Sequence, residues 1–140
     1  MIGLVLVTHG TLANALRDAM EHVVGKQKDV ATVCIESDAE FESQRAEIAS
    51  RVAEVDSGDG VILLTDMFGG TPSNLAMSMA TQPGIEIIGG VNLPMLVKLA
   101  KIRGTQALPE AVQCAEAAGR KYICSGHEAQ PASLPQRAAE

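Results

Sequence analysis

Short apolar segments alternate along this chain with longer segments in which apolar residues recur at helical spacing. The short segments span residues 2–7, Val30–Ile35, Val61–Thr65 and Ile85–Ile88, and Gly, Asp or Pro lies close to most of their ends. Runs of this length and composition are typical of buried β-strands. Because strands that alternate with helices pair in parallel through crossover connections, the pattern predicts an α/β fold.

The segments between these strands have the period of amphipathic helices. The first predicted helix has an apolar face made of Leu12, Leu16, Met20, Val23 and Val24. The second follows Asp38, a suitable cap, and its apolar positions are Phe41, Ile48, Val52 and Val55. Such one-sided patterns indicate helices that pack on the sheet.

Proline and glycine mark the remaining helices. Pro72 and Pro94 lie where a first helical turn tolerates proline, and a last helix is expected from Pro109 to a glycine cap at Gly119. Residues 121–124 then predict a short final strand, and the aperiodic residues 125–140 a flexible tail. We therefore expect one domain, residues 1–124, with an open, mostly parallel central sheet and helices on both faces.

Composition and charge exclude several classes of ligand. With 46% hydrophobic but only 2% aromatic residues, the core must be aliphatic, and few rings are left to stack on nucleobases. The formal net charge of -6 disfavours a nucleic-acid backbone or an anionic membrane surface as the target. Neither nucleic-acid binding nor membrane insertion is therefore expected.

The cysteines and the absence of a long apolar run indicate the compartment. Cys34, Cys114 and Cys124 are odd in number and widely spaced among apolar neighbours, which favours reduced core thiols over disulfides or zinc ligands. No run approaches the roughly 18 apolar residues of a membrane span. The opening run also lacks the basic segment of a signal peptide. We expect a cytoplasmic protein.

The first candidate for chemistry is His9, in the sequence Thr8-His9-Gly10-Thr11 between the first strand and the first helix. In a parallel sheet, reacting groups collect at the carboxyl ends of the strands. There a histidine lies beside free N–H groups at the positive end of a helix, which suits a transferring phosphoryl group. A histidine in such a loop can equally serve only to hydrogen-bond its own turn.

A second loop follows the third strand and begins with Asp66. A carboxylate there can orient an imidazole, while Gly69 and Gly70 offer N–H donors for phosphate oxygens and Thr71 supplies a capping hydroxyl. The same residues also describe an ordinary strand-to-helix turn with a glycine pair and a cap. Both interpretations use the same groups.

The remaining polar residues indicate no further site. A third loop, residues 89–94, is expected to shape the rim of the pocket or a docking surface. Lys98, Lys101 and Arg103 are read as a solvated face that complements the dipole of their helix. Exposed positions are expected for the other two histidines, and packing positions for the methionines. We therefore predict no metal site and no cofactor.

Three motifs together resemble the mannose-type enzyme IIA domain of the bacterial phosphoenolpyruvate-dependent sugar phosphotransferase system. They are V-T-H-G at 7–10, D-M-F-G-G-T-P-S-N at 66–74 and G-V-N-L-P-M-L at 90–96. Their order at three successive loops is far more specific than any one of them. The resemblance covers residues 2–124.

The resemblance implies roles for residues of this chain. His9 would accept a phosphoryl group from the histidine-containing phosphocarrier protein and pass it to a IIB partner, with Asp66 as the orienting carboxylate. The phosphoryl oxygens would be held by Gly10, Thr11, Gly69, Gly70 and Thr71. Members of this family are homodimers that exchange their last strand, which implies such an exchange by residues 120–124.

Other functions compete with this interpretation. Since no IIB domain follows here, the acceptor would be a separate chain, or the phosphohistidine would serve as a regulatory signal without sugar transport. A chelatase would need a large apolar cleft, and a histidine phosphatase has Arg where this chain has Thr8. Phosphate uptake from ATP is disfavoured because the G-x-x-x-x-G-K-[ST] signature is absent.

Overall fold

The computed structural model describes residues 1–133 of the chain. Within this range the elements are β1 (Gly3–His9), α1 (Leu12–Val24), β2 (Val30–Ile35), α2 (Phe41–Val55), β3 (Val61–Thr65), α3 (Thr71–Met77), β4 (Ile85–Ile88), α4 (Leu93–Ile102), α5 (Leu108–Lys121) and α6 (Gly126–Ser133). The four predicted strands are therefore present.

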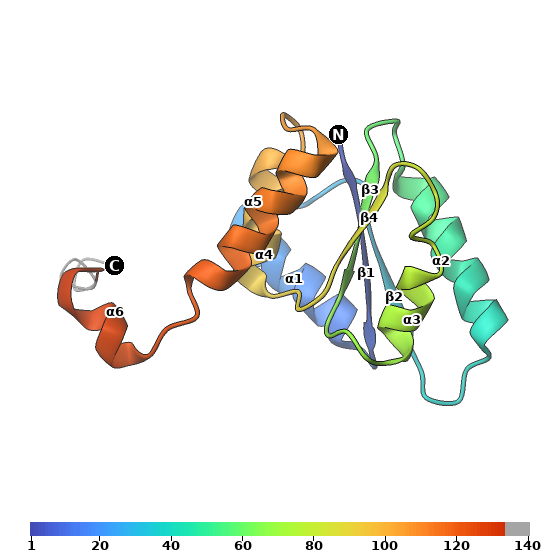
Figure 1. The fold of residues 1–140 in the computed structure, drawn as a ribbon, viewed down its shortest axis with the longest axis horizontal. Helices are drawn as coiled ribbons and strands as arrows, with labels where there is room; N and C mark the ends of the chain where they lie inside the picture. Colours follow the sequence, from blue (N-terminus) through green and yellow to red (C-terminus); the bar gives the residue numbers. More distant parts are fainter. Residues whose placement is uncertain (134–140) are drawn as a thin grey trace.

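The strands of the described chain form one parallel sheet in the order β2-β1-β3-β4. Helices α1, α4 and α5 cover one face and α2 and α3 cover the other, as Figure 1 shows. The predicted open, parallel α/β fold is thus confirmed. The winding reverses between β1 and β3, since β2 lies on one side of β1 and β3 on the other.

Alternation along the strands divides the core into two layers. Val5, Val7 and Leu63 of the strands share one layer with Ile48 of α2 and Leu75 of α3. Leu4, Leu6, Ile62 and Leu64 of the strands share the other layer with Leu96 of α4. Strands buried on both faces need apolar residues at every position, which is why β1 and β3 are continuous apolar runs. Each fully buried side chain of this kind contributes roughly 1.5–3 kcal/mol.

Gly119 does not end a helix as predicted, because α5 continues to Lys121. The residue is buried instead, and a Cβ there would lie 2.8 Å from Met95 Cε. Its carbonyl also accepts a hydrogen bond from Asn92 Nδ2 at 2.9 Å. Glycine is needed here for the close approach of α5 to the start of α4.

The end of the chain also differs from the prediction. In the described part, residues 120 and 121 finish α5 and residues 122–125 form neither helix nor strand, so the predicted final strand is wrong for the single chain. The expected aperiodic tail contains α6, which projects away from the sheet (Figure 1). Ser125 Oγ accepts from Glu128 N and Glu128 Oε1 from Ser125 N, a capping box that begins this helix. Residues 134–140 lie outside the described residues.

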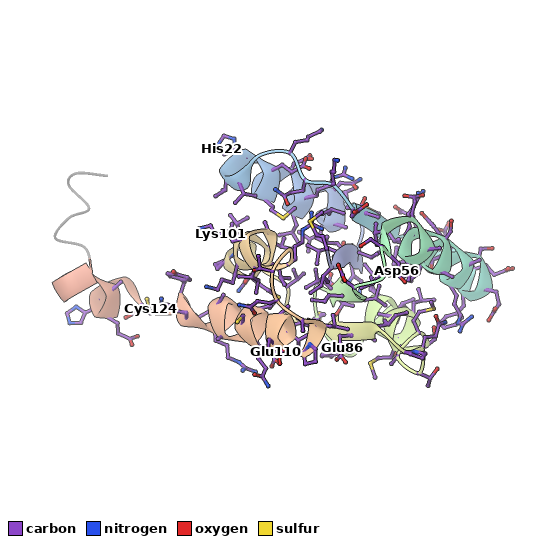
Figure 2. All side chains as sticks on the ribbon, turned by 90° about the horizontal axis from the view of Figure 1, so that it is seen from above. His22, Asp56, Glu86, Lys101, Glu110 and Cys124 are labelled. Carbon is purple, nitrogen blue, oxygen red and sulfur yellow. The ribbon has the colours of Figure 1, made fainter. Side chains whose placement is uncertain are left out.

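Exposure of the cysteines agrees only partly with the prediction of core thiols. All three are free; Cys34 and Cys114 are half-buried, but Cys124 is exposed on the segment between α5 and α6, as Figure 2 shows. None of the described helices is both long and apolar enough to span a membrane. A smaller difference concerns α2, which is preceded by Glu40 rather than Asp38 as its N-cap residue.

Arg103 is not part of a solvated face, in contrast to the prediction. Its side chain is buried, and the guanidinium donates to the carbonyls of Ile2 at 3.1 Å and Asp29 at 3.2 Å. It also donates to the Lys28 carbonyl and to Gln27 Oε1. Asp29 has a φ of 55°, so the cation holds the carbonyls of a turn in the left-handed region. Burial lowers the pKa of Arg103, although the nearby Asp29 opposes this shift.

We predict that Arg103→Met lowers the free energy of unfolding by roughly 2–4 kcal/mol, because several buried acceptors lose a charged donor. Urea unfolding followed by circular dichroism measures this value. Arg103→Lys should recover only part of it, since an ammonium cannot reproduce the planar guanidinium fork. The matched control is Arg51→Met on α2, where an exposed pair with Glu54 is lost. Equal effects of the Arg103 and Arg51 changes would contradict the assignment.

Candidate active site

His9 and Asp66 meet at the point where the winding of the sheet reverses. His9 is the last residue of β1 rather than a loop residue, and Asp66 directly follows β3, the neighbouring strand. Both strands end at the same edge because they are parallel. In open α/β sheets this reversal opens a crevice at the carboxyl edge, where ligands bind.

The Asp66 carboxylate holds both the ring and the backbone of His9. Its Oδ2 lies 2.8 Å from His9 Nδ1 and accepts from His9 N at 3.1 Å, while Oδ1 accepts from Met67 N at 3.0 Å. An ionised carboxylate can only accept, so Nδ1 carries the proton of this bond. In the neutral ring, Nε2 then has the free lone pair.

Asp66 is ionised at neutral pH. Burial alone would raise its pKa, but the hydrogen bonds from the His9 ring and backbone, together with attraction to the imidazole and its own backbone N–H, lower the pKa below the usual 3.8. Because the folded-state pKa is lowered, this carboxylate stabilises the fold above pH 3.8, and that contribution disappears as the pH falls through the lower value. The orienting bond therefore persists throughout the neutral range.

The Nε2 edge of the His9 ring lies beside Gly70. The His9 side chain is 53% exposed, whereas that of Asp66 is only 14% exposed. A Cβ on Gly70 would lie 3.0 Å from His9 Nε2 and 3.1 Å from Cε1. Glycine thus leaves the space that a group approaching Nε2 would need.

Two buried hydroxyls fix the loops on either side of this ring. Thr8 Oγ1 accepts from Ala13 N at 2.7 Å and so satisfies one of the free N–H groups in the first turn of α1. Ser73 Oγ accepts from Gly69 N at 3.0 Å and Gly70 N at 3.2 Å, and donates to Gly70 O at 2.9 Å. Sequence reasoning gave neither hydroxyl this role, although Ser73 stands at the third position of a helix, a common place for such a bond.

These bonds change the predicted set of phosphate donors. The N–H groups of Gly69 and Gly70 are engaged by Ser73, and Gly10 N donates to Ile35 O at 3.1 Å. Thr71 is the first helical residue after Gly70 and does not cap α3 as predicted. Among the described hydrogen bonds, none uses the exposed Thr11 or Thr71 as donor through its N–H. Binding of an anion by the three glycines remains a prediction that requires their present bonds to open.

The third loop and the other two histidines complete the set of sequence candidates. Asn92 in the third loop caps α4, where its Oδ1 accepts from Met95 N at 3.1 Å, and the expected role of this loop at the rim of the pocket stays a prediction. His22 and His127 are exposed, and His22 points away from the body of the protein in Figure 2. Within the described residues, no three His, Cys, Asp or Glu side chains gather in a way that could hold a metal ion.

Comparison with known proteins shows the family to which this chain belongs. The model of the family described as "PTS system fructose IIA component" matches residues 3–116. The chain belongs to this family. The resemblance drawn from the three motifs is therefore confirmed: the chain belongs to the phosphotransferase-system IIA family by sequence and by structure.

Relatives of this IIA chain include proteins with and without further domains. It is 31% identical over 124 residues to the "PTS system mannose-specific EIIAB component" of Escherichia coli K12, covering 87% of this chain and 38% of that protein. It is 25% identical to the "PTS system fructose-specific EIIA component" of Bacillus subtilis, covering 91% of this chain and 89% of that one. The IIA chain thus spans well under half of the Escherichia coli relative.

Solved structures of IIA proteins have the same fold. A phosphotransferase-system EIIA component from Streptococcus agalactiae superposes with a TM-score of 0.82 at 21% identity, covering 91% of this chain and 99% of that chain. A mannose/sorbose-specific IIA subunit from Enterococcus faecalis gives 0.78 at 26% identity, covering 89% and 93%. The first likeness concerns the fold alone.

We predict that Gly70→Ala slows the reaction of His9 with diethyl pyrocarbonate roughly tenfold, because the added methyl crowds Nε2. Mass spectrometry of the modified protein measures the rate at each histidine. Stability should change little, since the φ of -129° and ψ of -179° at Gly70 suit alanine. His22 in the same molecule is the internal reference.

Gly104→Ala is the matched control, because a Cβ there meets no atom within 4 Å. It should leave the rate at His9 unchanged. If Gly70→Ala and Gly104→Ala react alike, the Gly70 Cα does not border the approach to Nε2.

Proposed function

We propose that this IIA chain accepts a phosphoryl group on His9 Nε2 from the histidine-containing phosphocarrier protein and passes it to a separate IIB partner. The observation that carries the proposal is the bond between His9 Nδ1 and Asp66 Oδ2, which leaves Nε2 as the outward nucleophile. The family of the chain supports the same role. The proposed enzyme is a phosphotransferase that acts through phosphohistidine.

The transfer step needs only groups that this geometry supplies. The Nε2 lone pair would attack phosphorus while the bond from phosphorus to the donor's ring nitrogen breaks, and that electron pair stays on the donor ring. The proton on Nδ1 stays in the bond to Asp66, whose negative charge stabilises the ring as Nε2 becomes bonded to phosphorus. No cofactor or metal ion takes part in the proposed step.

Thr11 and Thr71 are the proposed contacts for the phosphoryl oxygens. Both are exposed. Thr11 follows His9 by two residues in the chain, and Thr71 follows Gly70, which lies beside the His9 ring. The start of α1, a helix of 13 residues, adds a favourable positive potential at the same place. Gly10, Gly69 and Gly70 would join only if their N–H groups leave their present acceptors.

Exposed apolar side chains beside the site support a protein as the donor. Leu12 is 42% exposed, Met67 56% and Phe68 55%, and they follow His9 and Asp66 closely in the chain. Large exposed apolar residues around a reactive group are typical of protein docking surfaces. The free thiols at Cys34, Cys114 and Cys124 support the reducing cytoplasm as the location.

We also propose a homodimer in which residues 122–125 pair with the β4 edge of a second copy. β4 is an edge strand, and Ile123 is 75% exposed. Ile123 borders a groove of about 420 Å³ along β4 that Ile87 and Ile88 also line. Pairing would cover both the unpaired strand edge and this apolar side chain.

The first expectation is that His9→Ala abolishes labelling of the purified chain by enzyme I, the phosphocarrier protein and labelled phosphoenolpyruvate. His22→Ala and His127→Ala are matched controls because both histidines are exposed, and they should label fully. Asp66→Asn should slow labelling roughly 10–100-fold, the usual effect of removing an orienting partner. Label that persists in His9→Ala would exclude the proposal.

A second labelled step distinguishes relay from signalling. If the phosphorylated chain donates to a purified mannose-type IIB domain, the relay is supported. If it labels on His9 but donates to no IIB domain, the regulatory phosphohistidine module is the better description.

The proposed dimer gives a separate prediction. Full-length protein at micromolar concentration should sediment as a dimer, and Ile123→Asp should yield monomers because a charge cannot be buried at the shared edge. Met77→Asp is the control, since Met77 is similarly apolar and 51% exposed but lies on α3. A monomeric unmodified chain would be incompatible with strand pairing.

A further inference from the structure

A groove separate from His9 runs between α1, α4 and α5. We call it the lysine groove; it is lined by Lys98, Lys101 and Lys121 and by an apolar floor that includes Leu93, Val97 and Ala118. Its volume is about 710 Å³, within the usual range of small-molecule sites. Figure 2 shows Lys101 on α4, between α1 with His22 and α5 with Glu110.

The charge of the lysine groove is opposite to that of the protein. The chain has 17 acidic and 11 basic residues, yet the groove lining contains three lysines and no Asp or Glu. Among the described ion pairs, none includes one of these lysines. Lys121 Nζ lies over the Tyr122 ring, 5.5 Å from its centre, and an anion in the groove would meet the positive charges of Lys98 and Lys101 beside an apolar surface.

Helix dipoles explain only part of this pattern. Lys101 and Lys121 lie in the last turns of α4 and α5, where cations are favourable in any helix. Lys98 lies a turn earlier than Lys101, and residues three apart are neighbours on a helix surface. The ammonium groups of Lys98 and Lys101 can therefore bind the same anionic group, and the apolar side chain of Val97 lies next to them.

The floor of the groove is held in place at both ends of α4. Asn92 caps the start of α4 and donates to Gly119 O of α5 at 2.9 Å, which joins the two helices. Arg103 fixes the other end through its buried hydrogen bonds. The groove is thus formed before any ligand arrives, which lowers the entropic cost of binding.

We propose that the lysine groove binds a small anionic amphiphile. Its acid group lies between Lys98 and Lys101, and its apolar chain covers Val97, Leu93 and Ala118. This ligand class satisfies the cations and the apolar floor together, whereas an inorganic anion would leave the floor bare. The proposal does not rest on phosphohistidine chemistry.

The test is a titration of the isotope-labelled full-length chain with decanoate, followed by amide chemical shifts in NMR spectra. Saturable shifts in α4, α5 and the end of α1 are expected. Decanol, which has the same chain without the charge, should bind about tenfold more weakly or worse. Lys98→Glu should weaken decanoate binding by a similar factor.

Arg51→Glu makes the same change of charge at an exposed position on α2 and should leave decanoate binding unchanged. Labelling of His9 should be equal in Lys98→Glu and the unmodified chain, so the outcome is independent of the proposed phosphoryl transfer. Equal affinity for decanoate and decanol, or no effect of Lys98→Glu, would overturn the proposal. A decanoate affinity that falls as the protein concentration rises would also overturn it, because a second copy would then compete for the groove.

Discussion

The pairing of β1 with β3 places a histidine and a carboxylate within hydrogen-bond distance, and the rest of the site depends on that pairing. Thr65, the last residue of β3, pairs with Val7, and β1 continues two residues further to His9. His9 and Asp66 then face each other across the reversal of the winding without a long loop between them. The site is thus as rigid as the sheet, whose two apolar layers hold β1 on both faces.

Buried side chains hold the loops on both sides of the His9 ring. Thr8 and Ser73 are buried, and their hydroxyls satisfy N–H groups at the two helix starts beside His9. Protein groups therefore hold these loops, and among the described residues the side chain that hydrogen-bonds the His9 ring is that of Asp66. Groups fixed before a reaction need no rearrangement during it, which is the main source of electrostatic catalysis in proteins.

Periodicity predicted the sheet because strands buried on both faces leave an unmistakable apolar run, and loop position predicted the meeting of His9 with Asp66. Prediction from the sequence failed where one residue type has two opposite structural roles. Glycine ends helices but also permits close helix packing, as Gly119 does, and arginine at a helix end can be solvated or, like Arg103, buried among carbonyls. Ser125 and Glu128 did carry a sequence signal, the spacing of a capping box, that the aperiodic composition of the tail concealed.

Helix α4 connects features at opposite edges of the sheet. Its first turn is tied by Asn92 to the loop after β4 and to Gly119 near the end of α5, whereas its last turn is tied by Arg103 to the segment before β2. A displacement of α5 at Gly119 would therefore act on the same asparagine that caps α4. Residues 122–125 follow Gly119 by only three residues, so the proposed pairing of this segment with a second copy would lie close to the α4–α5 contact. The proposed dimer contact and the lysine groove therefore both depend on the contact between α4 and α5. The His9–Asp66 pair does not depend on it, because β1 and β3 hold that pair.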